Sequence, residues 1–301
     1  MNTVRFLLLL SLLTPAACDK QPPASAPARS VQSTVGASPG WTSVVDWYGS
    51  LRDDERAALS SNQAFSVALN RVRAWDVNPK ELPSATWDLP VRYDQPGSAN
   101  LPHLASARGI GRLCFLKALS ELEAGHRDAA TTWLRAGTRI LTELGALPTV
   151  VERKAALDMC FDVTTFVSAN ASSAQKREFA QAFATINRKN PFELQTAVVF
   201  MRDWYVRDIR EHPESLKDTH GIDTADLKRN PMQAAKIVDE ALSAIANAWA
   251  NPNAPQLIDD ISRRYSSTPA RPFVIGFSRV SRRCKEAAYA LDTLSQSMPP
   301  N

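Results

Sequence analysis

The sequence predicts an all-α protein built from stacked helical hairpins, and three observations lead to this fold class. Proline is absent from helix-sized intervals such as 103–147, 149–190 and 232–251. Residues that cap helices stand at the starts of these intervals, and apolar residues within them recur every three or four positions, which gives a helix one buried face. The sequence contains neither Asn-Gly nor Asp-Gly, and no segment keeps the period-two alternation of a half-buried strand.

The composition is that of a folded protein with few charges in excess. Of the 301 residues, 44% are hydrophobic, which is enough for one large domain or two modest ones. The formal net charge of +4 is too small for a protein that wraps nucleic acid, so we expect no nucleic-acid partner. The four cysteines are too few for a disulfide scaffold. The sequence leaves open whether Cys114, Cys160 and Cys284 form a disulfide or pack as small buried residues.

The first 18 residues predict a secretory signal peptide. Arg5 supplies a positive charge, and residues 6–13 form an apolar run of eight residues. A helix of that length is too short to cross about 30 Å of hydrocarbon. Small residues follow at Ala16 and Ala17, as expected near a cleavage site. The chain is therefore predicted to be exported.

The end of this segment, Leu13 to Cys18, reads LTPAAC and resembles the lipobox of bacterial lipoproteins. In that family the chain is cleaved before a cysteine that then carries acyl chains, although Pro15 stands where the family usually has an aliphatic residue. The resemblance implies lipidation of Cys18 and a periplasmic location. Asp19 resembles the residue that retains some lipoproteins in the inner membrane, with the outer membrane as the alternative. A plain signal peptide cleaved nearby is the alternative to lipidation.

Two segments are expected to lack regular structure. Residues 19–40 are rich in Pro, Ala and Ser, so we expect a flexible tether with an end-to-end distance of about 25 Å. Residues 76–100 contain four prolines and several apolar side chains, which favours a strap packed over the helices, with a binding loop as the alternative. Residues 41–301 are expected to form the all-helical domain.

The helices of that domain are predicted in chain order from caps and apolar spacing. Residues 237–249 carry one apolar face, formed by Ile237, Val238, Ala241, Leu242, Ile245 and Trp249. The clearest N-terminal caps are Thr149 with Glu152, Ser172 with Gln175, Asn190 with Pro191 and Glu193, and Asn230 with Pro231 and Gln233. The expected helices cover 43–52, 54–74, 102–124, 127–144, 150–169, 173–187, 192–211, 232–249, 255–264 and 274–296.

The expected hairpin over 102–144 turns at Gly125 and resembles one unit of the tetratricopeptide repeat family. The match consists of small, small, bulky and small residues at Ala118, Ala130, Leu134 and Gly137. The resemblance implies two closely packed helices within a tetratricopeptide-like stack or an irregular α-solenoid. Lys117 and Glu121 depart from the pattern, because the family has a leucine and an aromatic residue there, and no second unit follows.

Residues 263–285 contain seven cations and no acidic residue. We interpret this basic segment as a surface for an acidic protein partner or for anionic lipid headgroups. The alternative is a solvated helix face, with Arg282 and Arg283 reaching acids elsewhere in the fold. Three aromatic residues are interleaved with the cations, namely Tyr265, Phe273 and Phe277. The candidate partner-binding residues are Arg263, Arg264, Arg271, Arg279, Arg282, Arg283 and Lys285.

Motifs for catalysis give little support to an enzyme. Neither the H-E-x-x-H metalloprotease motif nor the G-x-x-x-x-G-K phosphate loop occurs. His212 and His220 flank an acidic loop, but their spacing matches no metal site that we can justify, and a solvated loop is the simpler interpretation. The acidic groups at 53–55 and 259–260 are expected near helix N-terminal turns, where the helix dipole favours negative charge. We therefore assign no catalytic residue, metal ligand or cofactor.

Together these features favour a lipid-anchored periplasmic protein that binds an envelope or secreted protein. Such a protein is similar to envelope-assembly scaffolds and to periplasmic inhibitors or immunity proteins, and this comparison concerns the fold only. Two alternatives stay open: an envelope enzyme of unfamiliar type, with the strap over its site, and a helical protein that binds an apolar ligand.

Overall fold

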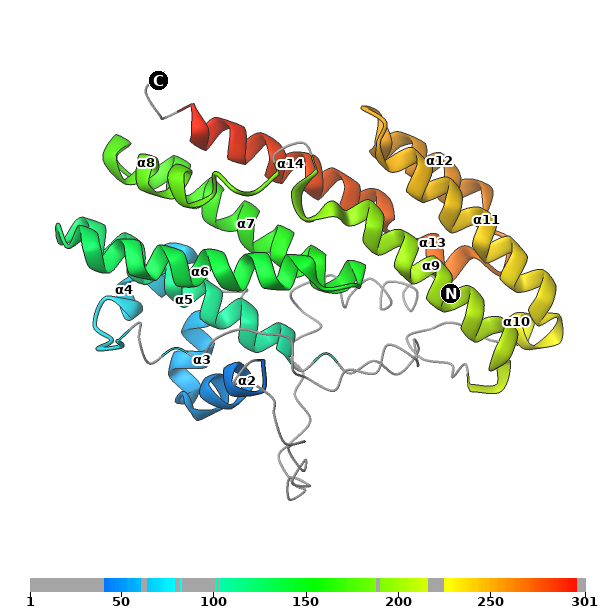
Figure 1. Cartoon of the computed structure of the whole chain (residues 1–301), viewed down its shortest axis with the longest axis horizontal. Helices are drawn as coiled ribbons and strands as arrows, with labels where there is room; N and C mark the ends of the chain where they lie inside the picture. The colour runs from blue at the N-terminus through cyan, green and yellow to red at the C-terminus, as the bar shows by residue number, and fades with distance from the viewer. Residues whose placement is uncertain are drawn as a thin grey trace. The chain divides into compact units, whose positions relative to one another are not determined.

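The predicted all-α class is confirmed. The computed structural model describes residues 41–60, 64–78, 82, 101, 103–187, 190–215 and 225–296, and these contain helices and no β-strand (Figure 1). The signal peptide, Cys18, the tether and most of the proline-rich segment lie outside the described residues. Among the helices in the described ranges, none is long and apolar enough to cross a membrane.

Contacts divide the described residues into two compact units. The N-terminal unit contains residues 41–82 and 101–143, and the C-terminal unit contains residues 144–296. The N-terminal unit has three short helices, α2 (Trp41–Ser50), α3 (Asp53–Leu59) and α4 (Phe65–Val72), which all contact the long helix α5 (His103–Glu123). Helix α6 (Arg127–Ala146) follows and ends at the boundary between the units.

The predicted hairpin around Gly125 is formed by α5 and α6. Gly125 takes the left-handed conformation, with φ of 82°, that lets the chain reverse between them. Ala118, Ala130 and Leu134 are buried. A Cβ atom at Gly137 would lie 2.9 Å from Cε1 of Phe115, so the missing side chain is what allows α6 to approach α5.

Three cations hold the C-terminal ends of the short helices in the N-terminal unit. Arg56 Nη1 donates to the carbonyl oxygen of Gly49, at 2.8 Å, and to that of Leu51 at the end of α2. From α5, Arg112 donates to the carbonyl of Ser60, which caps α3, and Lys117 donates to the carbonyl of Trp75 beyond α4. These carbonyls lie at or just beyond the C-terminal ends of the helices, where the helix dipole is negative, so a nearby cation is favourable.

The same contacts correct one expected helix and explain one departure from the repeat pattern. The single helix expected over 54–74 is wrong, because α3 ends at Ser60 with φ of −64° and ψ of 149°, and α4 begins at Phe65. Arg112 is 5% exposed, and its guanidinium lies 4.3 Å from the centre of the Phe65 ring. Lys117, which replaces a leucine of the repeat family, is buried, and its ammonium group donates to the carbonyl oxygen of Trp75, just beyond α4.

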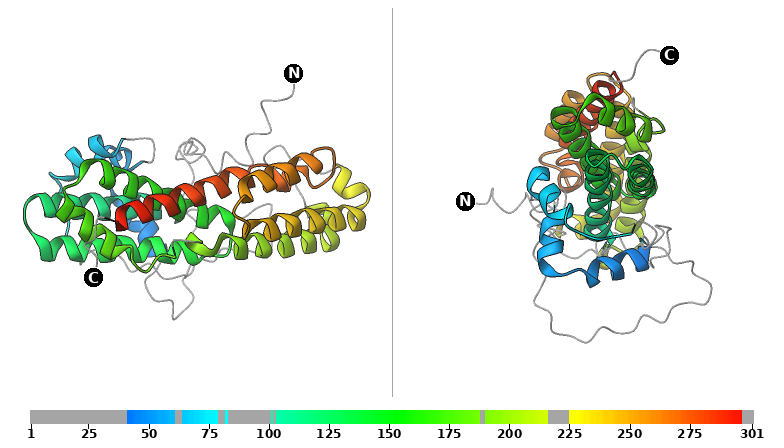
Figure 2. Two further views of the ribbon diagram at one scale, coloured as in Figure 1. Left: turned by 90° about the horizontal axis from the view of Figure 1, so that it is seen from above. Right: turned by 90° about the vertical axis from the view of Figure 1, so that its left-hand side faces the viewer.

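The C-terminal unit is assembled from pairs of helices that are not all neighbours in the sequence. Helix α9 lies beside α11, and α7 lies beside α14 (Figure 1, Figure 2). Its elements are α7 (Val150–Asn170), α8 (Ser173–Ala182), the 3-10 turn η4 (Pro191–Glu193), α9 (Leu194–Glu211), the 3-10 turn η5 (Pro213–Ser215), α10 (Ala225–Arg229), α11 (Pro231–Trp249), α12 (Ala254–Arg264), α13 (Arg271–Val274) and α14 (Phe277–Ser295).

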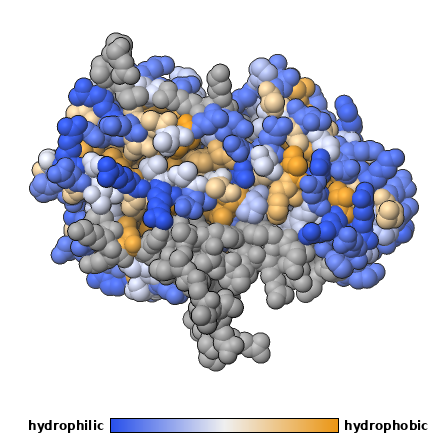
Figure 3. Space-filling view, viewed as in Figure 1, coloured by the Kyte–Doolittle hydropathy of each residue, from blue (hydrophilic) through white to orange (hydrophobic). Residues whose placement is uncertain are grey.

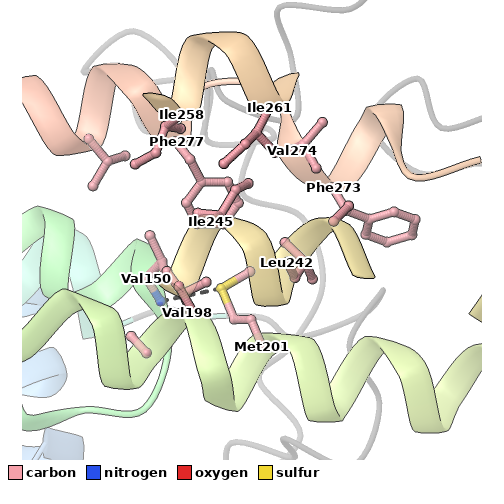
Figure 4. Packing of buried hydrophobic residues seen from close by; sticks show 14 of the residues in the cluster. Val150, Val198, Met201, Leu242, Ile245, Ile258, Ile261, Phe273, Val274 and Phe277 are labelled. Carbon is pink, nitrogen blue, oxygen red and sulfur yellow. Dashed lines mark hydrogen bonds between the residues drawn. The ribbon is translucent and has the colours of Figure 1, made fainter. Parts of the chain in front are cut away.

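The core of this unit lies where α9, α11, α12 and the start of α14 meet. Met201 of α9, Ile245 of α11, Ile258 of α12 and Phe277 of α14 are all buried and face one another (Figure 4). The apolar face predicted for 237–249 is confirmed: its residues are buried apart from Ile237, which is half-buried and packs against the same core.

Three of the four predicted caps are confirmed. Thr149 and Glu152 form a reciprocal capping box at the start of α7, and Ser172 and Gln175 do the same for α8. Asn230 Oδ1 accepts from the amide nitrogen of Gln233 at 3.3 Å. The cap predicted at Asn190 is wrong, because its side chain accepts no bond from the following turn and η4 precedes the helix.

The described cysteines are free thiols. Cys114, Cys160 and Cys284 are all buried, so the packing alternative holds for each of them. Burial raises the pKa of the Cys160 and Cys284 thiols to about 12 and raises the pKa of Cys114 further. Thiolate, the reactive form, is therefore scarce at neutral pH.

Candidate partner-binding surface

The basic segment folds into the end of α12, the short helix α13 and the first half of α14. The helix expected over 274–296 is confirmed with a later start, because Gly276 has φ of 91° and α14 covers Phe277–Ser295. The left-handed glycine lets the chain turn between α13 and α14, and Phe273, Val274 and Phe277 are buried in one hydrophobic cluster (Figure 4). Two of the three aromatic residues that the sequence places among the cations are therefore core residues.

Three contacts, made by the end of α13 and by α14, show that α12 and α14 run antiparallel. Ser262 Oγ donates to the carbonyl oxygen of Val274 at 3.0 Å. Arg282 Nη2 lies 3.2 Å from Asp259 Oδ2, and Lys285 Nζ donates to the carbonyl oxygen of Pro252. From Val274, the last residue of α13, along α14 to Lys285, the residue number rises while the number of the partner falls from Ser262 to Pro252. The first turns of α14 therefore lie beside the last turns of α12.

Arg282 and Arg283 do reach acids elsewhere, as the alternative interpretation of the basic segment expected. Arg282 pairs with Asp259, and Arg283 Nε lies 3.2 Å from Oδ1 of Asp158 on α7. The latter is an ion pair at an angle that makes no hydrogen bond, since Asp158 Oδ1 has no hydrogen-bond partner among the described residues. Arg263 pairs with Asp260 within α12. Asp259 and Asp260 thus stand in the middle of α12 as ion-pair partners, not in its first turn.

Arg283 belongs to the packing between α7 and α14. Its guanidinium lies 4.2 Å from the centre of the Phe161 ring, and its side chain is 33% exposed. Asp158 also pairs with Lys154, so one carboxylate joins two cations from two helices. Arg283 therefore contributes less to an outer surface than the sequence suggests.

The outer face of α14 carries Arg279, Arg282, Lys285 and Tyr289, and we call this set the α14 stripe. All four residues are exposed, and their spacing of three, three and four positions places them along one side of the helix. Tyr289 is 75% exposed. The sequence analysis missed Tyr289 because it lies beyond the basic segment, although its distance of seven positions from Arg282 was a visible signal.

The remaining cations lie around this stripe. Arg264 ends α12, and Arg271 begins α13, and both are exposed. In the described part of the chain, Arg264 and Arg279 have no carboxylate within ion-pair distance. The structure thus distributes the basic segment along the α12 and α14 pair, from the last turn of α12 to Pro252, just before its start, and it neutralises part of the charge.

Exposed apolar side chains elsewhere are scattered. Among the described residues, the large exposed apolar side chains are Val67, Met232, Leu257 and Tyr289, each on a different helix. On the face of the molecule in Figure 3, hydrophobic residues stand between hydrophilic ones. Scattered exposure of this kind is ordinary. Tyr289 differs because cations adjoin it on the same helix face.

The acidic and histidine groups weighed for chemistry do not converge in the described residues. Asp53, Asp54 and Glu55 occupy the first turn of α3, as predicted, and Arg56 pairs with Asp53. His212 is exposed at the end of α9, and His220 lies outside the described residues. Among the described residues, no group of three His, Cys, Asp or Glu side chains is placed to hold a metal ion.

The carboxyl group of Asp208 on α9 is buried at 4% exposure. Burial raises its pKa, while the charges of His212 and Arg207 act in the opposite direction. Tyr205, one turn earlier, stacks on Trp204 at 5.8 Å and packs against Phe273 at 4.8 Å between ring centres. This arrangement is a packed aromatic row beside a buried acid, and the described ranges place no set of metal ligands around it.

Comparison of the chain with protein-family models, with curated proteins and with solved structures finds no match.

Proposed function

We propose that the chain is a lipid-anchored periplasmic protein that binds an envelope or secreted protein through the α14 stripe and the neighbouring end of α12. The observation that carries this proposal is the exposed row of Arg279, Arg282, Lys285 and Tyr289. Lipidation of Cys18 would tether the folded part to the membrane, and Asp19 favours the inner membrane over the outer one.

The side-chain chemistry of the surface favours a protein partner with acidic groups. Six of the seven cations of the basic segment are arginines. A guanidinium group binds a carboxylate through two parallel hydrogen bonds, and arginine and tyrosine are both enriched in protein interfaces. Since Arg263 and Arg282 already pair with acids on α12, the surface is a mixture of charges and not a uniform positive field, which suits a complementary protein better than a membrane.

The test of binding uses the full chain, expressed in its own cells and purified with its associated proteins under mild detergent. We expect one partner in fixed ratio, identified by mass spectrometry and then mixed in purified form with the full chain. Arg279→Glu with Arg282→Glu is expected to weaken that affinity at least tenfold. Arg177→Glu with Lys236→Glu is the matched control, because it reverses two exposed charges on α8 and α11 of the same unit.

Two results would count against the proposed surface. Equal loss of affinity in the control pair would show a general charge effect, and unchanged affinity in the stripe variant would place the interface elsewhere. Binding of the full chain to vesicles containing phosphatidylglycerol, with no protein partner recovered, would favour anionic lipid headgroups instead.

The anchor has its own test. The native protein is compared with Cys18→Ala by intact mass and by membrane fractionation. We expect an acylated wild-type chain in the membrane fraction and a soluble variant. An unmodified, soluble wild-type chain would contradict lipidation and leave a secreted or freely diffusing protein.

A further inference from the structure

The turn before α9 holds two residues in a conformation that they rarely adopt. Phe192 has φ of 59° and ψ of 21°, and Glu193 has φ of 45° and ψ of 47°. These values are left-handed, and in this region the Cβ atom of an L-residue crowds the following carbonyl oxygen. Among the described residues, these two are the non-glycine residues with positive φ. Two in succession mark stored strain, which persists only when surrounding contacts enforce it.

Arg153 of α7 supplies the first of those contacts. Its Nη1 donates to the carbonyl oxygen of Phe192 at 2.9 Å and to that of Glu193 at 2.8 Å. Its Nε donates to the carbonyl oxygen of Leu147, just beyond α6, at 2.6 Å. The side chain is 7% exposed. One buried guanidinium therefore ties the strained carbonyls to the segment before α7.

Gly145 supplies the second contact. The Phe192 ring rests directly on this glycine, and a Cβ atom placed there would lie 2.2 Å from Cδ1 of the ring. The left-handed backbone is what directs the ring to this position. Replacement of Gly145 by any other residue would therefore displace the Phe192 ring.

A second helix start in the same chain has the same sequence motif and shows the conformation that this motif adopts without such contacts. Asn230 and Asn190 begin the same motif, Asn-Pro followed by Gln or Glu two residues later. Their backbones agree closely, with φ of −144° for both and ψ of 75° and 72°. At Asn230 the side chain caps the amide of Gln233, and α11 begins at the proline. At Asn190 the backbone is set for the same cap, but Oδ1 is buried and has no hydrogen-bond partner among the described residues.

We infer that Pro191–Glu193 is a two-state latch. In the held state, which the structure shows, Arg153 and Gly145 keep Phe192 and Glu193 left-handed. In the held state the Glu193 amide donates to the main-chain carbonyl oxygen of Asn190 at 3.2 Å. In the released state both residues turn right-handed, this amide exchanges the carbonyl oxygen for Asn190 Oδ1, and residues 191–193 become the first turn of α9. The turn contacts α7, α9 and α14, so its state sets how the segment after α8 joins three helices of the C-terminal unit.

The dipeptide Phe-Glu occurs once in the chain, which gives a selective probe. In full chain labelled with ¹³C-phenylalanine and ¹⁵N-glutamate, only the Glu193 amide is coupled to a labelled carbonyl carbon. A correlation through this amide reports the Cα shift of Phe192, which distinguishes left-handed from right-handed backbone. In the wild-type chain, we expect a left-handed shift and, by saturation transfer, a minor population with a helical shift.

Two variants are expected to release the latch by different routes. Arg153→Met removes the contacts to the carbonyl oxygens of Phe192 and Glu193 together with the contact to Leu147. Gly145→Ala displaces the Phe192 ring, so both variants should move the Phe192 Cα shift to helical values. Adding Asn190→Ala to either variant should reverse part of that change. Lys176→Met on α8 is the control and should leave the shift unchanged. A wild-type chain with no minor population, together with variants that keep the left-handed shift or lose folded structure, would overturn the inference.

Discussion

A comparison of alanine with glycine at position 193 measures the strain in the turn before α9 directly. Glu193 is exposed and left-handed, with φ of 45°. Replacing it with alanine or with glycine removes the same carboxylate, which lies near Arg153, so the difference between the two variants reports only the backbone. Glu193→Gly is expected to be the more stable variant.

The magnitude follows from two opposing terms. A left-handed L-residue costs about 1–2 kcal/mol relative to the right-handed form, and glycine escapes that cost. Glycine loses about 0.5–1 kcal/mol through the greater freedom of the unfolded chain. The glycine variant should therefore exceed the alanine variant by about 0.5–1 kcal/mol, which corresponds to a rise in Tm of about 1–4 °C for a unit of this size.

Position 240 provides the opposite expectation within the same unit. Glu240 lies inside α11 and pairs with Lys236 at 4.0 Å. There, alanine should be more stable than glycine by about 1 kcal/mol. Thermal and urea unfolding of the four variants, followed by circular dichroism, tests the reversal of sign. Greater stability of the alanine variant at both positions would show that Glu193 is not left-handed in the native protein.

Three further predictions concern other parts of the fold. Gly137→Ala should destabilise the protein by about 1–3 kcal/mol in urea unfolding, because its methyl group meets the Phe115 ring, whereas Gly49→Ala, with nothing within 4 Å, should not destabilise it. Asp208→Asn should raise Tm at pH 7 and leave it unchanged near pH 3. Burial raises the pKa of Asp208 in the folded protein above its value in the unfolded chain, so the neutral carboxyl group favours folding at low pH and this contribution is lost as pH rises through the folded pKa. The asparagine side chain stays neutral at both pH values. An equal effect at both pH values would contradict this reasoning. Arg283→Met should lower the free energy of unfolding by about 1–2 kcal/mol, since it breaks contacts with Asp158 and Phe161. Arg263→Met, at a side chain that is 77% exposed, should change it by no more than about 0.5 kcal/mol. Similar losses of stability in both variants would refute this distinction.

Local signals account for what the sequence predicted correctly. The caps at Thr149, Ser172 and Asn230 involve partners three residues away, so the sequence displays both members of each pair. The cap at Asn190 failed although its motif is as clear, because Arg153 and Gly145 act on that turn from other helices. The difference between the two asparagines is therefore tertiary.

At the candidate surface too, contacts between helices could not be predicted from the sequence. The sequence displays seven cations without an acid between them, but the acids that form ion pairs with Arg282 and Arg283 lie on α12 and α7. Helical periodicity beyond residue 285 would have found Tyr289. The signal peptide and the lipid anchor stay predictions, because they concern residues outside the described ranges.

The cations that cap α2, α3 and α4 imply an uneven pattern of sequence drift. Their acceptors are main-chain carbonyls at Gly49, Ser60 and Trp75, and every amino acid supplies such an oxygen. The capped residues can therefore change identity over evolution without losing the contact. Arg112 and Lys117 have no such freedom, because few side chains combine their length with a positive charge. Diverging copies of this chain should keep two buried cations on α5 while the short helices around it lose recognisable similarity.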